Sequence, residues 1–416
     1  MKQFLLTAFA LFLFTLNTQA QCPPGRYYDK IYGAKTNTAV LYGSNKNYLG
    51  NQQSLYMDIY EPQGDNFARR PLIILAFGGS FTSGVRQSPD MLVLCDEFAK
   101  RGYVTATIDY RIGKENGDDT AMYKAVIRGL QDMNAAIRFF YKDVYTQNKY
   151  RIDTTQIFVG GTSAGGFIGL NSVYYIPLFS RPTNDDLLNT LVDMGGMLNG
   201  SGNEGYSNKV KGVVNLSGGI LDTIWIQPNS PILVSVHGTA DETVPFYYDS
   251  IKGITDIKAR FFGSGDIAVR CANIGHNCAT RPFYGADHVP FVLPSTPYLP
   301  PSKQYMDSTI WFLRDFLSAN TVCDPALVSV QETELPLPLS VLPTYSDDLI
   351  QVFSHHDKPV LVNIYRLDGK LLLSERLNPE QVLNLRKEKT GAGLFVLEML
   401  DAENHAYKRT EKVVFY

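Results

Sequence analysis

The chain of 416 residues is long enough for one large domain and a small second one. Hydrophobic residues make up 44% and charged residues 19%, a balance typical of a protein with a large buried core and not of a disordered one. With 38 Lys and Arg against 41 Asp and Glu, the formal net charge of −3 excludes the basic surface on which nucleic-acid binding depends.

The first twenty residues predict a signal peptide. Lys2 supplies a positive start, residues 4–16 form an apolar run too short to span a bilayer, and residues 18–20 end in a small residue before the expected cleavage. Gln21 stands where a lipoprotein signal needs Gly, Ala or Ser before Cys22, so we expect a soluble exported protein. No later segment is apolar enough to predict a membrane span.

Five cysteines then meet an oxidising compartment, in which disulfides form. Cys271 and Cys278 are close in a stretch expected to be a loop and are placed to pair locally, whereas the partners of Cys22, Cys95 and Cys323 stay open. His276 between the first two raises a metal site as the alternative. Because no second ligand pair follows, a disulfide is favoured, and we expect neither metal nor cofactor.

From residue 52 onward, predicted strands and helices alternate. The run 71–77 is apolar on both faces, as in a central strand covered by helices on either side. Such alternation predicts a mostly parallel sheet with helices on both faces. The predicted strands are 54–60, 71–77, 103–109, 156–160, 210–216 and 231–237, and the predicted helices are 91–101, 125–141, a helix opening at 165, and 305–317.

Residues 174–209 interrupt this pattern with Pro, Gly, Asn and Asp. An insertion at this place predicts a cap or lid over the site, and a disordered surface loop is an equally good interpretation. Together, residues 21–320 form the predicted α/β domain.

A Pro-rich linker is predicted at 321–345, because repeated prolines cannot continue a helix. Beyond it, residues 346–416 contain apolar runs without helical spacing, and Asp368-Gly369 between two of them predicts a hairpin. We expect a separate small all-β domain, a β-sandwich.

The strongest chemical signal is Gly161-Thr-Ser-Ala-Gly-Gly166, set between a buried strand and a helix. A hydroxyl nucleophile must stand clear of the sheet on a tight turn, where only small neighbours fit. The helix N-terminus behind it favours negative charge on an attacked ester oxygen. Ser163 is therefore the predicted nucleophile.

An oxyanion hole needs two backbone N–H donors. Ala164, directly after the nucleophile, offers one. The second is expected from the Gly-rich loop after strand 71–77, where glycine lets the backbone approach a substrate. We assign Gly79, with Ser80 as the second choice.

A candidate acid and a candidate base follow the nucleophile along the chain. Asp241 follows strand 231–237, and His288 lies in a later loop before the last helix. Glu242 is a rival acid, whereas Asp287 is too near His288 in sequence to orient it. We interpret His237 as structural, holding the turn to Asp241.

Residues 52–318 resemble the α/β-hydrolase carboxylesterase and lipase superfamily. The stretch 77–80, Phe-Gly-Gly-Ser, is similar to the His-Gly-Gly-Gly motif of the hormone-sensitive-lipase-like group but differs at its first and last positions. Asp109-Tyr-Arg111 resembles that group's Asp-Tyr-Arg, and residues 237–245 match a His-Gly-x-x-Asp-x-x-Val-Pro pattern common in the superfamily. The resemblance implies an α/β-hydrolase fold.

Residues 346–416 resemble the C-terminal sorting domain of type IX secretion cargo in Bacteroidota. The segments 367–374, 391–397 and 412–415 carry the likeness. It implies interaction with the type IX secretion machinery, and export through the periplasm of a Gram-negative bacterium to the cell surface or medium.

The function expected from these features is hydrolysis of a carboxylic ester through an acyl-enzyme on Ser163. Export and a 12% aromatic content favour acetyl or feruloyl esters of polysaccharide as substrates. A serine peptidase of the same fold is one alternative, although it usually carries an additional substrate-selecting domain. A non-catalytic extracellular binding protein is the other, and its signature would be a lost member of the triad.

Overall fold

The computed structural model describes residues 22–115, 120–175, 190, 193–196, 200–250, 260–292, 302–323, 339–342, 345–346, 348–354, 358–366, 370–379, 381–402 and 408–415. The predicted signal peptide, most of the predicted cap, residues 324–338 of the linker and the Asp368-Gly369 turn lie outside this part of the chain. The described residues form two units with separate cores, a first unit (22–323) and a tail unit (339–415).

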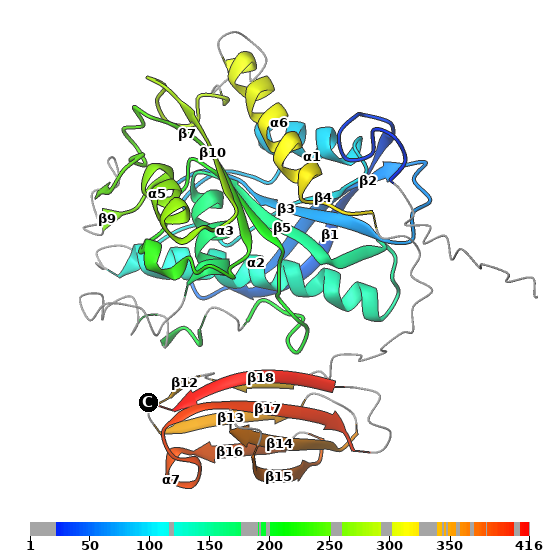
Figure 1. The fold of residues 1–416 in the computed structure, drawn as a ribbon, viewed down its shortest axis with the longest axis vertical. Coiled ribbons are helices and arrows are strands. Elements are labelled where there is room, and N and C mark those ends of the chain that lie inside the picture. Colours follow the sequence, from blue (N-terminus) through cyan, green and yellow to red (C-terminus); the bar gives the residue numbers. More distant parts are fainter. Residues whose placement is uncertain are drawn as a thin grey trace, which may run out of the picture.

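An eight-stranded sheet forms the centre of the first unit, in the order β1-β2-β4-β3-β5-β6-β7-β10 (Figure 1). Strands β1 and β2 pair antiparallel, as do β2 and β4, and the remaining neighbours are parallel. The bounds are β1 Gly33–Lys46, β2 Gln52–Gln63, β3 Arg70–Ala76, β4 Val104–Ile108, β5 Ile152–Thr162, β6 Gly212–Leu216, β7 Ile232–Gly238 and β10 Cys278–Phe283.

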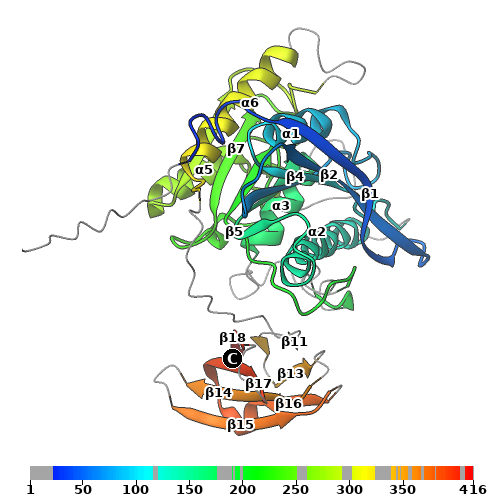
Figure 2. The same cartoon turned by 90° about the vertical axis from the view of Figure 1, so that its right-hand side faces the viewer.

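Helices cover both faces of this sheet, with α1 and α6 on one face and α2 and α3 on the other (Figure 2). The bounds are α1 Pro89–Ala99, α2 Ala121–Tyr145, α3 Ala164–Tyr174, α5 Ser264–Ile274 and α6 Ser302–Ala319. Every residue of β3 and β4 is buried, because helices exclude water from both sides. The predicted fold class is confirmed.

Smaller elements complete the first unit. They are the single-turn helix η3 (Thr223–Trp225), which lies between β6 and β7 in the chain, and the antiparallel pair of β8 (Asp249–Ser250) and β9 (Arg260–Phe261). None of the described helices is long and apolar enough to cross a membrane.

Two disulfides join the cysteines of the first unit. Cys271 pairs with Cys278, as predicted, but the two lie in α5 and at the start of β10, so our expectation of a loop there is wrong. Cys22 pairs with Cys323, and Cys95 is free and buried. In the described residues no three His, Cys, Asp or Glu side chains gather as ligands for a metal.

The tail unit consists of two sheets, with strand orders β11-β13-β16 and β12-β18-β17-β14-β15. It starts at β11, earlier than the predicted boundary at residue 346, because Leu339–Leu342 pairs with β13 between prolines that an edge strand tolerates. The bounds are β11 Leu339–Leu342, β12 Tyr345–Ser346, β13 Leu349–Ser354, β14 Val360–Arg366, β15 Leu371–Leu377, β16 Val382–Arg386, α7 Lys387–Thr390, β17 Gly393–Asp401 and β18 Lys408–Phe415.

Candidate active site

Ser163 occupies the turn that joins β5 to α3 and has φ 53° and ψ −113°. Such a conformation is strained for a residue with a Cβ and persists only where the surrounding structure imposes it. The neighbouring Gly161 and Gly165 are required because a larger side chain has no room at either position. A Cβ at either Gly161 or Gly165 would lie 1.9 Å from the carbonyl oxygen of Ala76 on β3. The turn therefore holds the serine hydroxyl at the carboxyl edge of the sheet.

The structure brings Ser163, His288 and Asp241 together at this edge. The Nε2 atom of His288 is 2.9 Å from Ser163 Oγ, and its Nδ1 atom is 2.7 Å from Asp241 Oδ2. Asp241 follows β7 and His288 follows β10, so three parallel strands end at one place. The side chain of Asp241 is fully buried, whereas that of His288 keeps 16% of its surface exposed.

The Asp241 carboxylate receives hydrogen bonds on both oxygens. Oδ1 accepts the backbone N–H groups of Thr243 and Val244 at 2.9 and 2.7 Å, and Oδ2 accepts from His237 and His288. Burial alone would raise the pKa of this group, but the two imidazole partners outweigh it and hold the pKa at about 2. Asp241 is therefore ionised at neutral pH.

Glu242, the rival acid, does not contact His288 with its side chain. Glu242 is exposed, and the group that it contributes to the loop is its backbone N–H, which donates to Asp287 Oδ1 at 3.0 Å. Asp287 also accepts the backbone N–H of His288 at 2.7 Å. Asp287 therefore braces the loop that carries His288, and Asp241 is the carboxylate in contact with the imidazole.

Free backbone donors lie beside Ser163. Within the described residues, the N–H groups of Gly79, Ser80 and Ala164 have no acceptor in the protein. A Cβ on Gly78 would be 3.2 Å from Ser163 Cβ, which places the Gly-rich loop against Ser163. Gly79 has φ 135° and Ser80 has φ 52°, so this loop turns sharply. Unpaired amides next to a nucleophile are the groups that an oxyanion hole requires.

The Asp109-Tyr-Arg111 segment supports this loop. Tyr110 donates its hydroxyl to the carbonyl of Phe77 at 3.1 Å, and the two rings stack with centroids 4.4 Å apart. Asp109 forms an ion pair with Arg86 at 2.7 Å. The sequence resemblance identifies this motif, and the structure gives its first two residues a role in fixing the loop.

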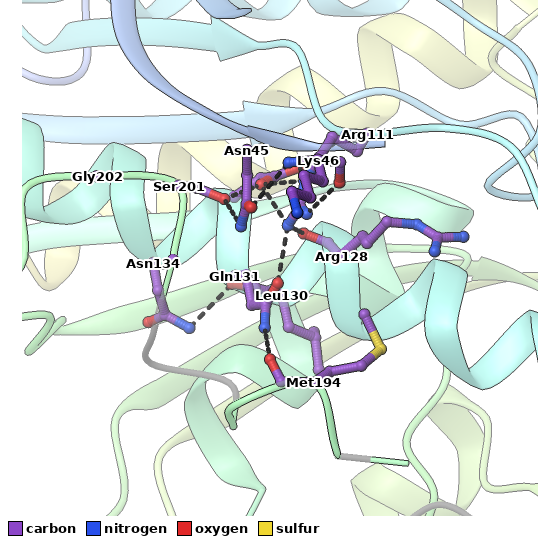
Figure 3. A network of polar contacts seen from close by, with 12 residues as sticks. Asn45, Lys46, Arg111, Arg128, Leu130, Gln131, Asn134, Met194, Ser201 and Gly202 are labelled. Atoms are coloured by element: carbon purple, nitrogen blue, oxygen red, sulfur yellow. Dashed lines mark hydrogen bonds and ion pairs between the residues drawn. The ribbon is translucent and has the colours of Figure 1, made fainter. Parts of the chain in front are cut away.

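Arg111 belongs to a buried polar network around α2 (Figure 3). Its Nε and backbone N–H both donate to Asp132, a carboxylate that also accepts from the hydroxyl of Ser201. Gln131 donates to the carbonyl of Met194 at 3.0 Å. The described parts of the predicted cap are thus tied to α2 by side chains of that helix.

The family BD-FAE, an esterase family of the α/β-hydrolase type, matches residues 57–174. The first unit has the α/β-hydrolase fold. Comparison of the chain with curated proteins finds no match.

Among solved structures, the chain is similar to a thermophilic esterase of the Planctomycetes species Thermogutta terrifontis. The propionate-bound form is 23% identical, with 72% of this chain and 99% of that chain covered at a TM-score of 0.48. The native form is also 23% identical, with 73% of this chain and 98% of that chain covered at a TM-score of 0.48. Esterase 2 of the same organism, phosphorylated by paraoxon, is 22% identical, with 71% of this chain and 97% of that chain covered at a TM-score of 0.48.

Two features of the site were not found from the sequence. The hydroxyl of Tyr110 holds the Gly-rich loop, and His237 contacts the Asp241 carboxylate itself and not merely the turn before it. The signal for His237 was present, because it lies four residues before Asp241 at the end of a buried strand. Its further partner Ser264, 27 residues away, gave no such signal.

Proposed function

We propose that the protein is a serine carboxylic-ester hydrolase that works through an acyl-enzyme. The Ser163 hydroxyl attacks the ester carbonyl and passes its proton to Nε2 of His288. Backbone N–H groups of Ala164 and of Gly79 or Ser80 stabilise the resulting oxyanion. His288 then protonates the leaving alcohol, and a water molecule, deprotonated by the same imidazole, releases the acid.

One observation carries this proposal. A continuous line of hydrogen bonds runs from Ser163 Oγ through His288 to the buried Asp241, and free backbone amides lie beside Ser163. The acid has the charge that the steps need. Asp241 stays ionised because its pKa is about 2, so it can stabilise the imidazolium that forms during attack. The scheme uses no metal or cofactor.

For the substrate class, we propose acetyl or feruloyl esters of polysaccharide. The match to BD-FAE supports an ester substrate. Three exposed tyrosines, Tyr247, Tyr248 and Tyr284, lie in the segments after β7 and β10 that also carry Asp241 and His288. Tyrosine rings offer flat apolar area with a polar tip, which suits contact with sugar or feruloyl rings.

The test is a substrate panel with a matched inactive variant. Purified protein is assayed on p-nitrophenyl esters of graded chain length, on feruloyl esters and on acetylated xylan. We expect hydrolysis that Ser163→Ala reduces on the order of a millionfold, with an unchanged circular dichroism spectrum. A variant that retained a few per cent of the wild-type rate would exclude Ser163 as the nucleophile.

We also propose that the protein is exported. In this proposal residues 1–20 are removed as a signal peptide, and the type IX secretion machinery recognises the tail unit. Two disulfides in the first unit support an oxidising destination. The separate core of the tail unit supports a role distinct from catalysis, because a unit with its own core does not depend on the active site.

A further inference from the structure

Three buried polar side chains stand behind Asp241 and take no part in the steps proposed above. His237 lies on β7, Asn215 lies on β6, and Ser264 is the first residue of α5. All three are fully excluded from solvent. A buried polar group is costly unless its hydrogen bonds are satisfied, so the partners of each can be followed in turn.

The direction of the first hydrogen bonds follows from Asn215. Its Oδ1 accepts the backbone N–H of Gly218 at 2.9 Å, which fixes the orientation of the side-chain amide. Nδ2 therefore faces Ser264 Oγ at 3.1 Å and donates to it. With an oxygen lone pair already used, the Ser264 hydroxyl has its hydrogen available for Nδ1 of His237, 2.9 Å away.

The other ring nitrogen of His237 faces acceptors on both sides. Nε2 lies 3.0 Å from Asp241 Oδ2 and 2.9 Å from the carbonyl oxygen of Val244. Neither oxygen has a hydrogen to donate, because Asp241 is ionised and a carbonyl only accepts, so Nε2 carries the hydrogen. Since Nδ1 accepts from Ser264, the imidazole is neutral and is held in the Nε2–H tautomer.

We propose that His237, held in this tautomer by Ser264 and Asn215, is a positioning residue that sets the Asp241 carboxylate for its hydrogen bond to His288. The inference rests on the proposed ester hydrolysis. The backbone amides hold Oδ1 of Asp241, while His237 and His288 share Oδ2, so the carboxylate has no free rotation. A neutral donor achieves this without adding a positive charge that would compete with the imidazolium of His288.

A purely structural role makes a different prediction. If His237 serves only to hold the turn through its hydrogen bond to the Val244 carbonyl, loss of the imidazole lowers the stability of the turn. The turnover of the folded enzyme is then unchanged. The substitutions His237→Gln and His237→Phe separate the two roles, because the glutamine amide nitrogen can replace Nε2–H and the phenyl ring fills the space without a donor.

Turnover and KM of both variants are measured on p-nitrophenyl acetate with the full chain, beside their melting temperatures. We expect His237→Phe to lower kcat by about tenfold to a hundredfold with KM nearly constant, since a lost hydrogen bond to a charged group has about that effect on a rate. His237→Gln should restore most of kcat. A loss that falls on KM, an unchanged kcat in His237→Phe, or no rescue by glutamine overturns the proposal.

Nitrogen NMR of protein labelled with ¹⁵N-histidine gives a readout that needs no activity. The spectrum should contain a neutral Nε2–H histidine that is absent from both variants, and His288 should keep its Nδ1–H signal in His237→Gln but not in His237→Phe. An Nδ1–H or doubly protonated His237 contradicts the inference. A wild-type protein that hydrolyses no ester but has these signals instead refutes the proposed function and leaves the positioning contact intact.

Discussion

Removal of the disulfide between Cys22 and Cys323 should cost the first unit much of its stability. The two cysteines are separated by 301 positions, whereas Cys271 and Cys278 are separated by 7. A cross-link restricts the unfolded chain more as the loop it closes becomes longer. The chain-entropy relation gives about 5 to 6 kcal/mol for the long loop and about 2.4 kcal/mol for the short one.

The measurement is equilibrium unfolding in guanidinium chloride of two double variants, Cys22→Ser with Cys323→Ser and Cys271→Ser with Cys278→Ser. Tryptophan fluorescence follows the first unit alone, because both tryptophans of the chain, Trp225 and Trp311, lie in it. The long-loop variant should unfold at the lower denaturant concentration. If it unfolds at the same concentration as the short-loop variant, or later, then restriction of the unfolded chain is not how these bonds stabilise the protein.

Four further outcomes are expected. The double variant Ser163→Ala, His288→Ala should turn over p-nitrophenyl acetate hardly more slowly than either single variant, because triad residues act as one unit; additive losses would contradict this. Tyr110→Phe removes the hydrogen bond to the Gly-rich loop but keeps the stacked ring, so urea unfolding should reveal a loss of about 1 kcal/mol in stability and kinetics a lower kcat; unchanged values would dismiss the role of the hydroxyl. Burial raises the pKa of Cys95 to about 12, so the thiol is protonated at pH 8.5, and iodoacetamide should label it only after denaturation. A chain that ends at Cys323 should hydrolyse esters normally but fail to leave a bacterium that has type IX secretion, and normal export would reject the sorting role of the tail.

The sequence was most informative where a strand is buried on both faces. Strands β3 and β4 are mostly apolar on both faces, and their position between helix layers follows from that composition. The strands at the two edges of the sheet were missed. β1 has most of its residues exposed or half-buried, and β10 contains Arg281 and Pro282, so neither has the periodicity or apolar content by which strands are recognised.

In the candidate site too, residues marked by local sequence patterns were predicted, and residues that depend on long-range contacts were not. Ser163 and Asp241 were predicted because each follows a predicted strand with glycine or proline nearby, and His288 because it lies in a Gly-containing loop before the last predicted helix. Ser264 and Asn215 were not, since their importance lies in contacts made across 27 and 49 positions of the chain. Such contacts depend on how β6, β7 and α5 pack, and local patterns carry no information about that packing.

The order of strands in the tail unit determines when it can fold. Strand β18 lies inside its sheet, between β12 and β17, and contributes Val413 and Phe415 to the core. The sheet therefore cannot assemble until about 90 residues after Cys323 have been synthesised. At about 5–20 residues per second, the first unit gains a lead of about 5 to 18 seconds. During that interval the tail is still an incomplete chain, whereas the sequence of the first unit is already complete.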